Sequence, residues 1–366
     1  MGKNHLKNQI INYFVMTVFV VLLIKVKIIF DCFTYIVRQE VLQNNRSSRH
    51  IMEEALFPGY VDGDYLFELE PGDETIDYCS YEWQEINDPV MIATNTDAKE
   101  AINTIETTGI TYDYNDLYDV SFLTQNCFNI SASAVVYPEE INPETMLSMD
   151  TTIDLQSDDV KVLIYHTHGT EAFADSREGV VEDTVIGLGD ELARILTEEY
   201  GINVYHDKTA YDYVEGSLNR ERSYEYSSAG VDEILAQYPS IEMIIDVHRD
   251  GVKEDVRLVQ QINGKNCAKL MFVNGVSRLT STGDLAYLEN PYKKENIAFG
   301  FALHLKGKEL YGDLMRKNYI SGYRYNLNKM PKAALVEVGA QTNTVEEARN
   351  SMEPLAAIIY RVISGT

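Results

Sequence analysis

The fold is decided by residues 160–171, which read VKVLIYHTHGTE. The first six residues form an apolar run interrupted by one lysine, and such a run predicts a strand buried inside a sheet. Polar residues follow at once. Ligands of α/β proteins bind beyond the carboxyl ends of parallel strands, so this change from apolar to polar residues indicates a functional site.

The alternation of strand and helix continues from this stretch to the C-terminus. We expect helices at residues 184–200, before Pro239, at 295–317 and at 344–363, and strands at 202–205, 241–247, 268–273 and 334–338. Apolar strands that alternate with helices predict an α/β fold with a mostly parallel sheet covered by helices. The sequence therefore predicts one folded domain over residues 159–366.

Residues 41–158 are acidic and rich in tyrosine, with few periodic runs. We interpret them as a stalk or a small accessory region, with a helix at residues 98–107 and a short strand at 131–137 (SASAVVY). A solvated spacer with little fixed structure is the alternative.

Residues 10–24 read IINYFVMTVFVVLLI and carry no charge, and apolar residues resume after two lysines to residue 30. Residues 10–30 together are long enough to cross a hydrocarbon core of about 30 Å. No small-residue cleavage site follows them, which favours an uncleaved anchor over a signal peptide. We therefore expect a transmembrane helix in residues 1–40, but the lysines on both sides leave its orientation open.

The composition excludes several classes of function. The chain has 57 Asp and Glu against 31 Lys and Arg, a net charge of -26, which opposes binding to nucleic acid. Its four cysteines form no C-x-x-C pair, so zinc ribbons and thioredoxin-like motifs are excluded. A disulfide between Cys79 and Cys127 and unpaired thiols remain alternatives.

Polar side chains lie at or within three of the predicted strands, at ends that should meet at one edge of the sheet. They are His166, His168 and Glu171 after the first strand, His248, Arg249 and Asp250 after residues 241–247, and Glu337 within residues 334–338. Two or three imidazoles and one carboxylate from different strands describe a catalytic zinc site with an open position for water. The alternative is structural, with a histidine capping a strand and Glu337 paired with Arg249. The metal site is favoured because three independent structural explanations would have to coincide.

Glu337 suits the role of general base, because a lone carboxylate in an apolar strand is costly to bury without a function or a partner. Asp246 and Asp250 are either partners of metal-bound histidines or structural charges. The triplet His-Arg-Asp at 248–250 is not accompanied by the glycine-rich loop of a kinase, and no nucleotide-binding motif occurs.

Three blocks in this order, VLIYHTHGTEAF (162–173), IIDVHRDG (244–251) and ALVEVGAQTNTVEEA (334–348), resemble the stage II sporulation protein P family. The resemblance implies a zinc-dependent N-acetylmuramoyl-L-alanine amidase that also cleaves peptide crosslinks of peptidoglycan, with a catalytic domain at residues 159–366 similar in fold to the cell-wall amidases. It further implies a cytoplasmic tip, a single anchor in the cell membrane and a catalytic domain outside the cytoplasm. Engulfment of the forespore during sporulation is the implied process, with a lytic transglycosylase and a polytopic membrane protein as partners.

The resemblance also implies roles for single residues. His168 and His248 match zinc ligands, and Glu337 matches the catalytic glutamate. Glu182, near the start of the next helix, is the best-placed match for the third ligand, and Glu171 is its rival or a neighbour of the ligands. Contacts to the ligands or to substrate are expected from His166, Asp246, Arg249 and Asp250.

Two other functions remain to be separated from this one: a zinc peptidase that acts on protein, and a catalytically silent scaffold that binds the cell wall. The site should be an open groove, because peptidoglycan cannot enter a deep pocket. Tyr323 and Tyr325 are candidates for its lining or for ordinary packing.

Overall fold

The structure is a computed structural model that describes residues 109–214 and 216–366. The predicted membrane segment, the helix expected at residues 98–107 and Cys79 lie outside these residues. Within the described part of the chain, no helix is both long enough and apolar enough to span a bilayer. Cys127 and Cys267 are buried free thiols.

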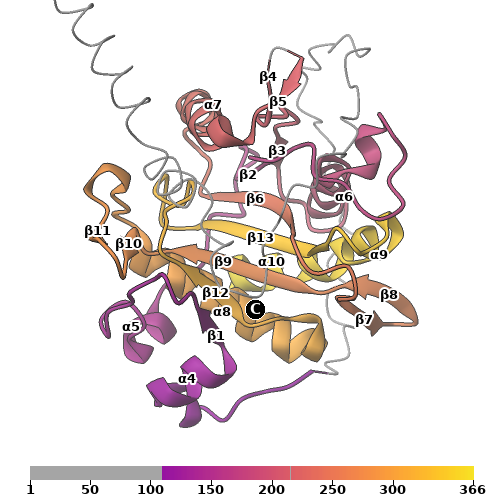
Figure 1. Cartoon of the computed structure of the whole chain (residues 1–366). Helices are drawn as coiled ribbons and strands as arrows, with labels where there is room; N and C mark the ends of the chain where they lie inside the picture. Colours follow the sequence, from indigo (N-terminus) through magenta and orange to yellow (C-terminus); the bar gives the residue numbers. More distant parts are fainter. Residues whose placement is uncertain (1–108, 215) are drawn as a thin grey trace, which may run out of the picture. The chain divides into compact units, whose positions relative to one another are not determined.

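A seven-stranded sheet forms the centre of the described domain (Figure 1). Its strands run in the order β1 (Phe128–Ile130), β12 (Asn318–Ser321), β9 (Leu270–Gly275), β13 (Ala333–Ala340), β6 (Met243–Asp250), β2 (Val162–Tyr165) and β3 (Val204–His206). Neighbouring strands are parallel except for β9 and β13, which are antiparallel. The predicted mostly parallel α/β sheet is confirmed.

Helices cover both faces of the sheet, because side chains alternate along each strand and both faces are apolar. One face packs against α6 (Val185–Glu198), α8 (Lys293–Tyr311), α9 (Val345–Asn350) and α10 (Met352–Ser364), and the other against α7 (Ser223–Gln237). On β2, for example, Ile164 lies in the core under α6, whereas Leu163 lies in the core under α7. We call these two sides the α6 face and the α7 face.

Two predicted helices are shorter than expected. The helix expected at 295–317 ends at Tyr311, because Gly312 adopts the left-handed backbone (φ 54°). The helix expected at 344–363 is interrupted at Ser351, between α9 and α10, where the serine hydroxyl donates to the backbone carbonyl of Ala268 on a neighbouring strand.

Short hairpins complete the domain outside the main sheet. They are β4 (Tyr213–Val214) with β5 (Ser217–Leu218), β7 (Val259–Ile262) with β8 (Lys265–Ala268), and β10 (Arg278–Leu279) with β11 (Gly283–Asp284).

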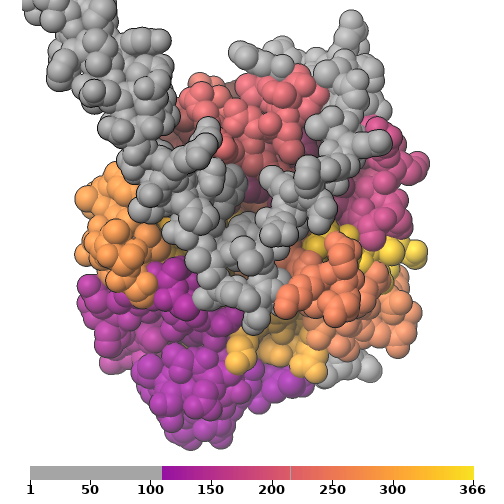
Figure 2. All heavy atoms as spheres, in the orientation of Figure 1, coloured from indigo at the N-terminus to yellow at the C-terminus, as the bar shows by residue number. Residues whose placement is uncertain are grey.

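Residues 109–158, expected as part of a stalk, pack into the same domain as the sheet. Strand β1 pairs with β12 at the sheet edge, and α4 (Val120–Asn126) and α5 (Pro143–Ser148) share an apolar core with α8. The prediction of a strand at residues 131–137 is wrong. The strand in this region is β1, which ends at Ile130, and Ala134 makes only an isolated bridge to Leu279. In Figure 2 the purple surface of these residues adjoins the orange surface of the β10–β11 hairpin.

Candidate metal centre and active site

The centre lies on the α7 face, where β6 and β13 run side by side. In their parallel register Glu337 is paired with His248. β6 extends further than predicted, to Asp250, so His248 lies on a strand and not in the loop after it, and Glu337 lies within β13 as expected. Strand pairing therefore fixes their separation.

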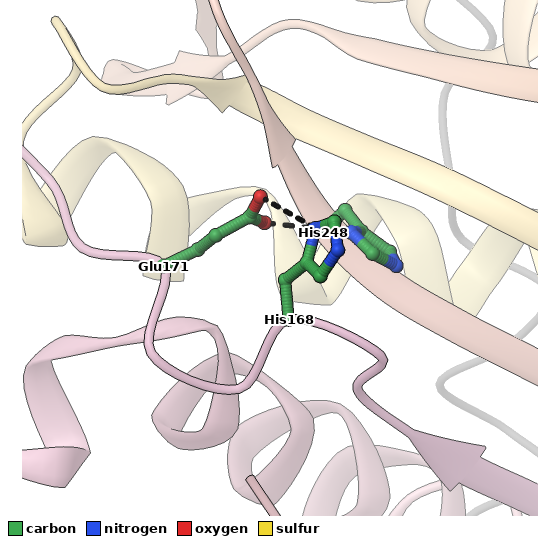
Figure 3. A group of neighbouring side chains, drawn as sticks. All are labelled: His168, Glu171 and His248. Atoms are coloured by element: carbon green, nitrogen blue, oxygen red, sulfur yellow. Dashed lines mark ion pairs between the residues drawn. The ribbon is translucent and has the colours of Figure 1, made fainter. Parts of the chain in front are cut away.

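His168, Glu171 and His248 converge on one point (Figure 3). One nitrogen of each histidine and one carboxylate oxygen all lie within 4.8 Å of one another. The Nδ1 atoms of His168 and His248 are 3.4 Å and 3.5 Å from the two oxygens of Glu171. A turn after β2, in which the Glu171 amide donates to the carbonyl of His168, brings the carboxylate back to the first histidine.

Ser223, at the start of α7, determines which nitrogen of His168 faces this point. Its hydroxyl lies 2.9 Å from His168 Nε2 and donates its single proton to the carbonyl of Arg220. The serine oxygen must therefore accept from His168 Nε2–H. A neutral His168 then presents an unprotonated Nδ1, the form that binds a metal ion.

Asp246 plays the corresponding part for the second histidine. It lies two residues before His248 on β6, hence on the same face of the sheet, and its Oδ1 is 2.8 Å from His248 Nε2. The Asp246 carboxylate accepts from the amide and the hydroxyl of Thr167. Both histidines thus turn Nδ1 toward Glu171 and Nε2 toward an oxygen of the protein.

The field at the centre favours positive charge. Burial raises the pKa of Glu171, but the neighbouring imidazoles of His168 and His248 outweigh it, so that the pKa lies well below its usual value. Burial lowers the pKa of His248, but the charges of Asp246 and Glu171 raise it well above its ordinary value. A site that stabilises a proton between two carboxylates also suits a bound cation.

Glu337 is the exceptional carboxyl group of the site. Burial, and next the negative charge of Asp250, raise its pKa to about 8. Its Oε2 is buried and has no hydrogen-bond partner among the described residues. A buried carboxyl oxygen without a partner beside a cluster of possible ligands is costly for folding and indicates a catalytic role.

Glu182, the expected third ligand, lies outside the cluster. It belongs to the short 3-10 helix Val181–Asp183, and its backbone carbonyl accepts from Arg349. Glu171, the rival expected from the sequence, is the carboxylate that the structure brings to the two histidines.

His166, expected to contact ligands or substrate, points to the α6 face. Its position follows from alternation along the chain, since Val162 and Ile164 of β2 face α6 as well. Its Nδ1 is 3.0 Å from the carbonyl of Val247 and its Nε2 is 2.8 Å from His206 Nε2. Burial, and next the neighbouring His206, lower the pKa of His166 to about 3. It lies in the core and is not part of the cluster.

Arg249 and Asp250 lie beside the centre and are engaged with the protein. The Arg249 amide donates to Glu171, and its side chain donates to the carbonyl of Ala172. Asp250 forms an ion pair of 2.7 Å with Arg316. The alternative pairing of Glu337 with Arg249 is therefore not formed.

Sequence reasoning missed Ser223, Tyr224 and Thr167. The ring of Tyr224 contacts the ring of His168 edge to face, with centroids 5.5 Å apart, and also contacts Tyr325. Tyr323, in contrast, is buried. The only signal in the sequence was the place of Thr167 between two histidines; nothing in the pattern of α7 distinguished its first residues.

Comparison with known proteins shows which family this chain resembles. A family model described as Stage II sporulation protein P matches residues 85–360. The Stage II sporulation protein P of Bacillus subtilis (strain 168) is 27% identical over 216 residues, which are 54% of this chain and 49% of that protein. The chain thus spans about half the length of this curated relative.

Solved structures of two amidases also resemble the chain. The N-acetylmuramoyl-L-alanine amidase AmiC2 of Nostoc punctiforme is 19% identical with a TM-score of 0.33, over 56% of this chain and 94% of that one. The CwlD amidase of Clostridioides difficile, in complex with the GerS lipoprotein, is 16% identical with a TM-score of 0.34, over 55% and 94%. The family model, in contrast, covers well over half of the residues, and the chain belongs to the stage II sporulation protein P family.

Proposed function

We propose that the chain is a zinc-dependent peptidoglycan hydrolase of sporulation that cleaves the amide between N-acetylmuramic acid and L-alanine, and also peptide crosslinks. One observation carries the proposal. In a member of this family, two histidines and a glutamate converge at a point beside Glu337, which is half-buried and has one buried carboxyl oxygen without a partner among the described residues.

The donor set fits zinc. Two imidazole nitrogens and one carboxylate are the three protein ligands of a known class of catalytic zinc site, which keeps a fourth position for water. His168, Glu171 and His248 would hold the ion. When bound, zinc lowers the pKa of water and polarises a carbonyl group.

Glu337 is the base in this mechanism. Its Oε2 accepts the proton of the attacking water and returns it to the nitrogen of the leaving amine. A carboxyl group with a pKa near neutral pH is suited to both steps, because it gains and loses a proton with little cost.

The other residues keep the ligands in place. Ser223 and Asp246 hold the Nε2 atoms of His168 and His248, and Tyr224 packs against the ring of His168. Such partners orient metal-binding imidazoles and reduce the entropy lost on binding the ion.

We also propose the setting that the sequence suggested. Residues 10–30 would anchor the chain in the cell membrane with the catalytic domain outside the cytoplasm, where peptidoglycan lies. A lytic transglycosylase and a polytopic membrane protein are the proposed partners in engulfment. The uncharged apolar run and membership of the family support this part of the proposal.

The test is the release of muropeptides from purified sacculi by the full-length chain in detergent, with zinc measured by plasma emission spectrometry. We expect near-stoichiometric zinc and free muropeptides, with casein uncleaved. Folded protein that holds no zinc in metal-replete buffer would contradict the proposal. Cleavage of casein but not of sacculi would favour a protein peptidase, and zinc without any hydrolysis would favour a scaffold.

A further inference from the structure

Thr167, between the two histidines of the His-Thr-His sequence, lies outside the group of possible metal ligands and holds Asp246. Its amide is 2.9 Å from Asp246 Oδ1, and its hydroxyl is 2.6 Å from Asp246 Oδ2. Asp246 in turn lies against His248 Nε2. The carboxylate therefore receives donors on both oxygens.

The hydrogen bonds continue from Thr167 away from the centre. Thr167 Oγ1 is 3.0 Å from the hydroxyl oxygen of Ser227 on α7, and Asn326 Nδ2 donates to that oxygen at 2.8 Å. Asn326 lies in the segment between β12 and β13. All these side chains are buried, so solvent does not supply replacement partners.

The direction of every bond in this row is determined by counting protons. A hydroxyl group has one proton, and the proton of Thr167 goes to the carboxylate of Asp246. The proton between Thr167 and Ser227 must then belong to Ser227, so Ser227 can only accept from Asn326. The amide NH₂ group is the end that can donate, and it is the end that faces Ser227.

We propose that Asn326, Ser227 and Thr167 are positioning residues of the metal centre. Their one-way row of hydrogen bonds holds the Asp246 carboxylate 2.8 Å from His248 Nε2, so that Nδ1 of His248 is the nitrogen presented to the ion. The inference rests on the proposed zinc site and adds residues from α7 and from the β12–β13 segment that touch no ligand of that site. Loss of such outer partners typically weakens metal binding about 10–100-fold.

The first test compares two serines that are equally buried and are each replaced by alanine. Ser227→Ala interrupts the row, whereas Ser351→Ala removes an equally buried hydroxyl between α9 and α10. Zinc affinity of the full-length chain is measured by competition with a fluorescent chelator, and the melting temperature of the metal-free chain is measured beside it. We expect both variants to lose some thermal stability, but only Ser227→Ala to bind zinc more weakly, by about tenfold.

The second test uses Thr167 and Asn326. Thr167→Val removes the hydroxyl donor to Asp246 Oδ2 and should weaken zinc binding, and Thr167→Ser should restore it. Asn326→Asp replaces the donating amide by an acceptor, leaves no proton between Ser227 and Thr167, and should also weaken binding. Because the links act in series, Ser227→Ala should add little to Thr167→Val.

The outcomes separate this inference from the proposed function. Wild-type affinity in Thr167→Val, Asn326→Asp and Ser227→Ala, in a chain that does bind zinc, would overturn the positioning role alone. A wild-type chain without zinc affinity would overturn both. Weaker zinc binding in these variants, with Ser351→Ala unchanged, would establish the role whether or not sacculi are hydrolysed.

Discussion

Glu337 on β13 and His248 on β6 are direct partners in the parallel register of the two central strands, and both face α7. Backbone pairing, and not a loop, sets the distance between the proposed base and a proposed ligand. Such an arrangement is rigid, because hydrogen bonds on both sides of β13 hold the strand between β6 and β9. It explains how a carboxyl group can be kept beside the proposed metal centre without being one of its ligands.

Glu337→Gln should abolish hydrolysis without loss of zinc. The amide has the same shape but cannot accept the proton of the attacking water, and loss of a general base typically reduces the rate by about 10²–10⁴-fold. Release of muropeptides from sacculi measures the rate, and emission spectrometry measures the zinc. Substantial hydrolysis by Glu337→Gln would show that another group is the base.

Glu171→Gln and Glu182→Gln separate the two candidates for the third ligand. Glu171 faces both histidines, so its loss should weaken zinc binding by at least the factor of about ten that is typical of outer partners. Glu182→Gln should bind zinc like the wild type, since that side chain is not in the cluster. The reverse result in the chelator competition would return Glu182 to the site.

The sequence was sufficient for the central strands and for the residues on them. β2, β6 and β13 are apolar runs whose polar residues stand out, and parallel pairing brings those residues together. The sequence could not decide whether Glu171 or Glu182 is the third ligand, because the choice depends on the turn that folds Glu171 back to His168.

Non-local packing accounts for the remaining errors of prediction. Strand β1 has three residues, too few for a periodic pattern, and it joins the sheet by pairing with β12 from the far end of the chain. His166 was grouped with His168 by proximity in sequence, although alternation sends it to the α6 face, where it meets His206. No pattern within either segment reveals its partner.

Gly189→Ala should destabilise the protein although alanine favours helices. A Cβ at residue 189 would lie 2.5 Å from His166 Nε2 and 2.4 Å from His206 Nε2. Overpacking of a core costs about 1–3 kcal/mol, against a gain in helix propensity of about 1 kcal/mol. The urea midpoint of Gly189→Ala should be lower than that of the wild type. In a His206→Ala background the same substitution should lower the midpoint by less. Equal effects in both backgrounds would mean that the imidazole of His206 does not cause the clash.

Arg278→Met should be strongly destabilising. Arg278 and Glu140 are both buried and form a bidentate ion pair with distances of 2.8 Å and 3.0 Å, which joins the segment after β1 to the β10–β11 hairpin. Loss of Arg278 leaves buried Glu140 with Lys293, 3.6 Å away, as its remaining cation, and breaking a buried ion pair costs about 3–5 kcal/mol. The double variant Arg278→Met/Glu140→Leu should recover much of the stability in urea unfolding. A single variant as stable as the wild type would show that this segment does not depend on the pair.

His304 on α8 should make the protein less stable at acidic pH. Burial, and next the nearby charge of Lys308, lower the pKa of its imidazole to about 3, and its Nε2 has no partner among the described residues. The unfolded chain binds the proton with a pKa of about 6.5, so the stability from neutral His304 is complete above that pH. It is lost as the pH falls from about 6.5 toward 3, by up to about 1.4 kcal/mol per pH unit.

His304→Asn keeps a donor for the carbonyl of Arg316, which His304 Nδ1 contacts at 3.1 Å, and does not titrate. A chelator is present in every sample. The free energy of unfolding, measured with urea, should therefore fall less steeply with decreasing pH for the variant than for the wild type. Above pH 7 the two plots of this free energy against pH should run parallel. Identical slopes between pH 6 and pH 4 would mean that His304 takes up its proton in the folded protein, which a buried ring beside a lysine should resist.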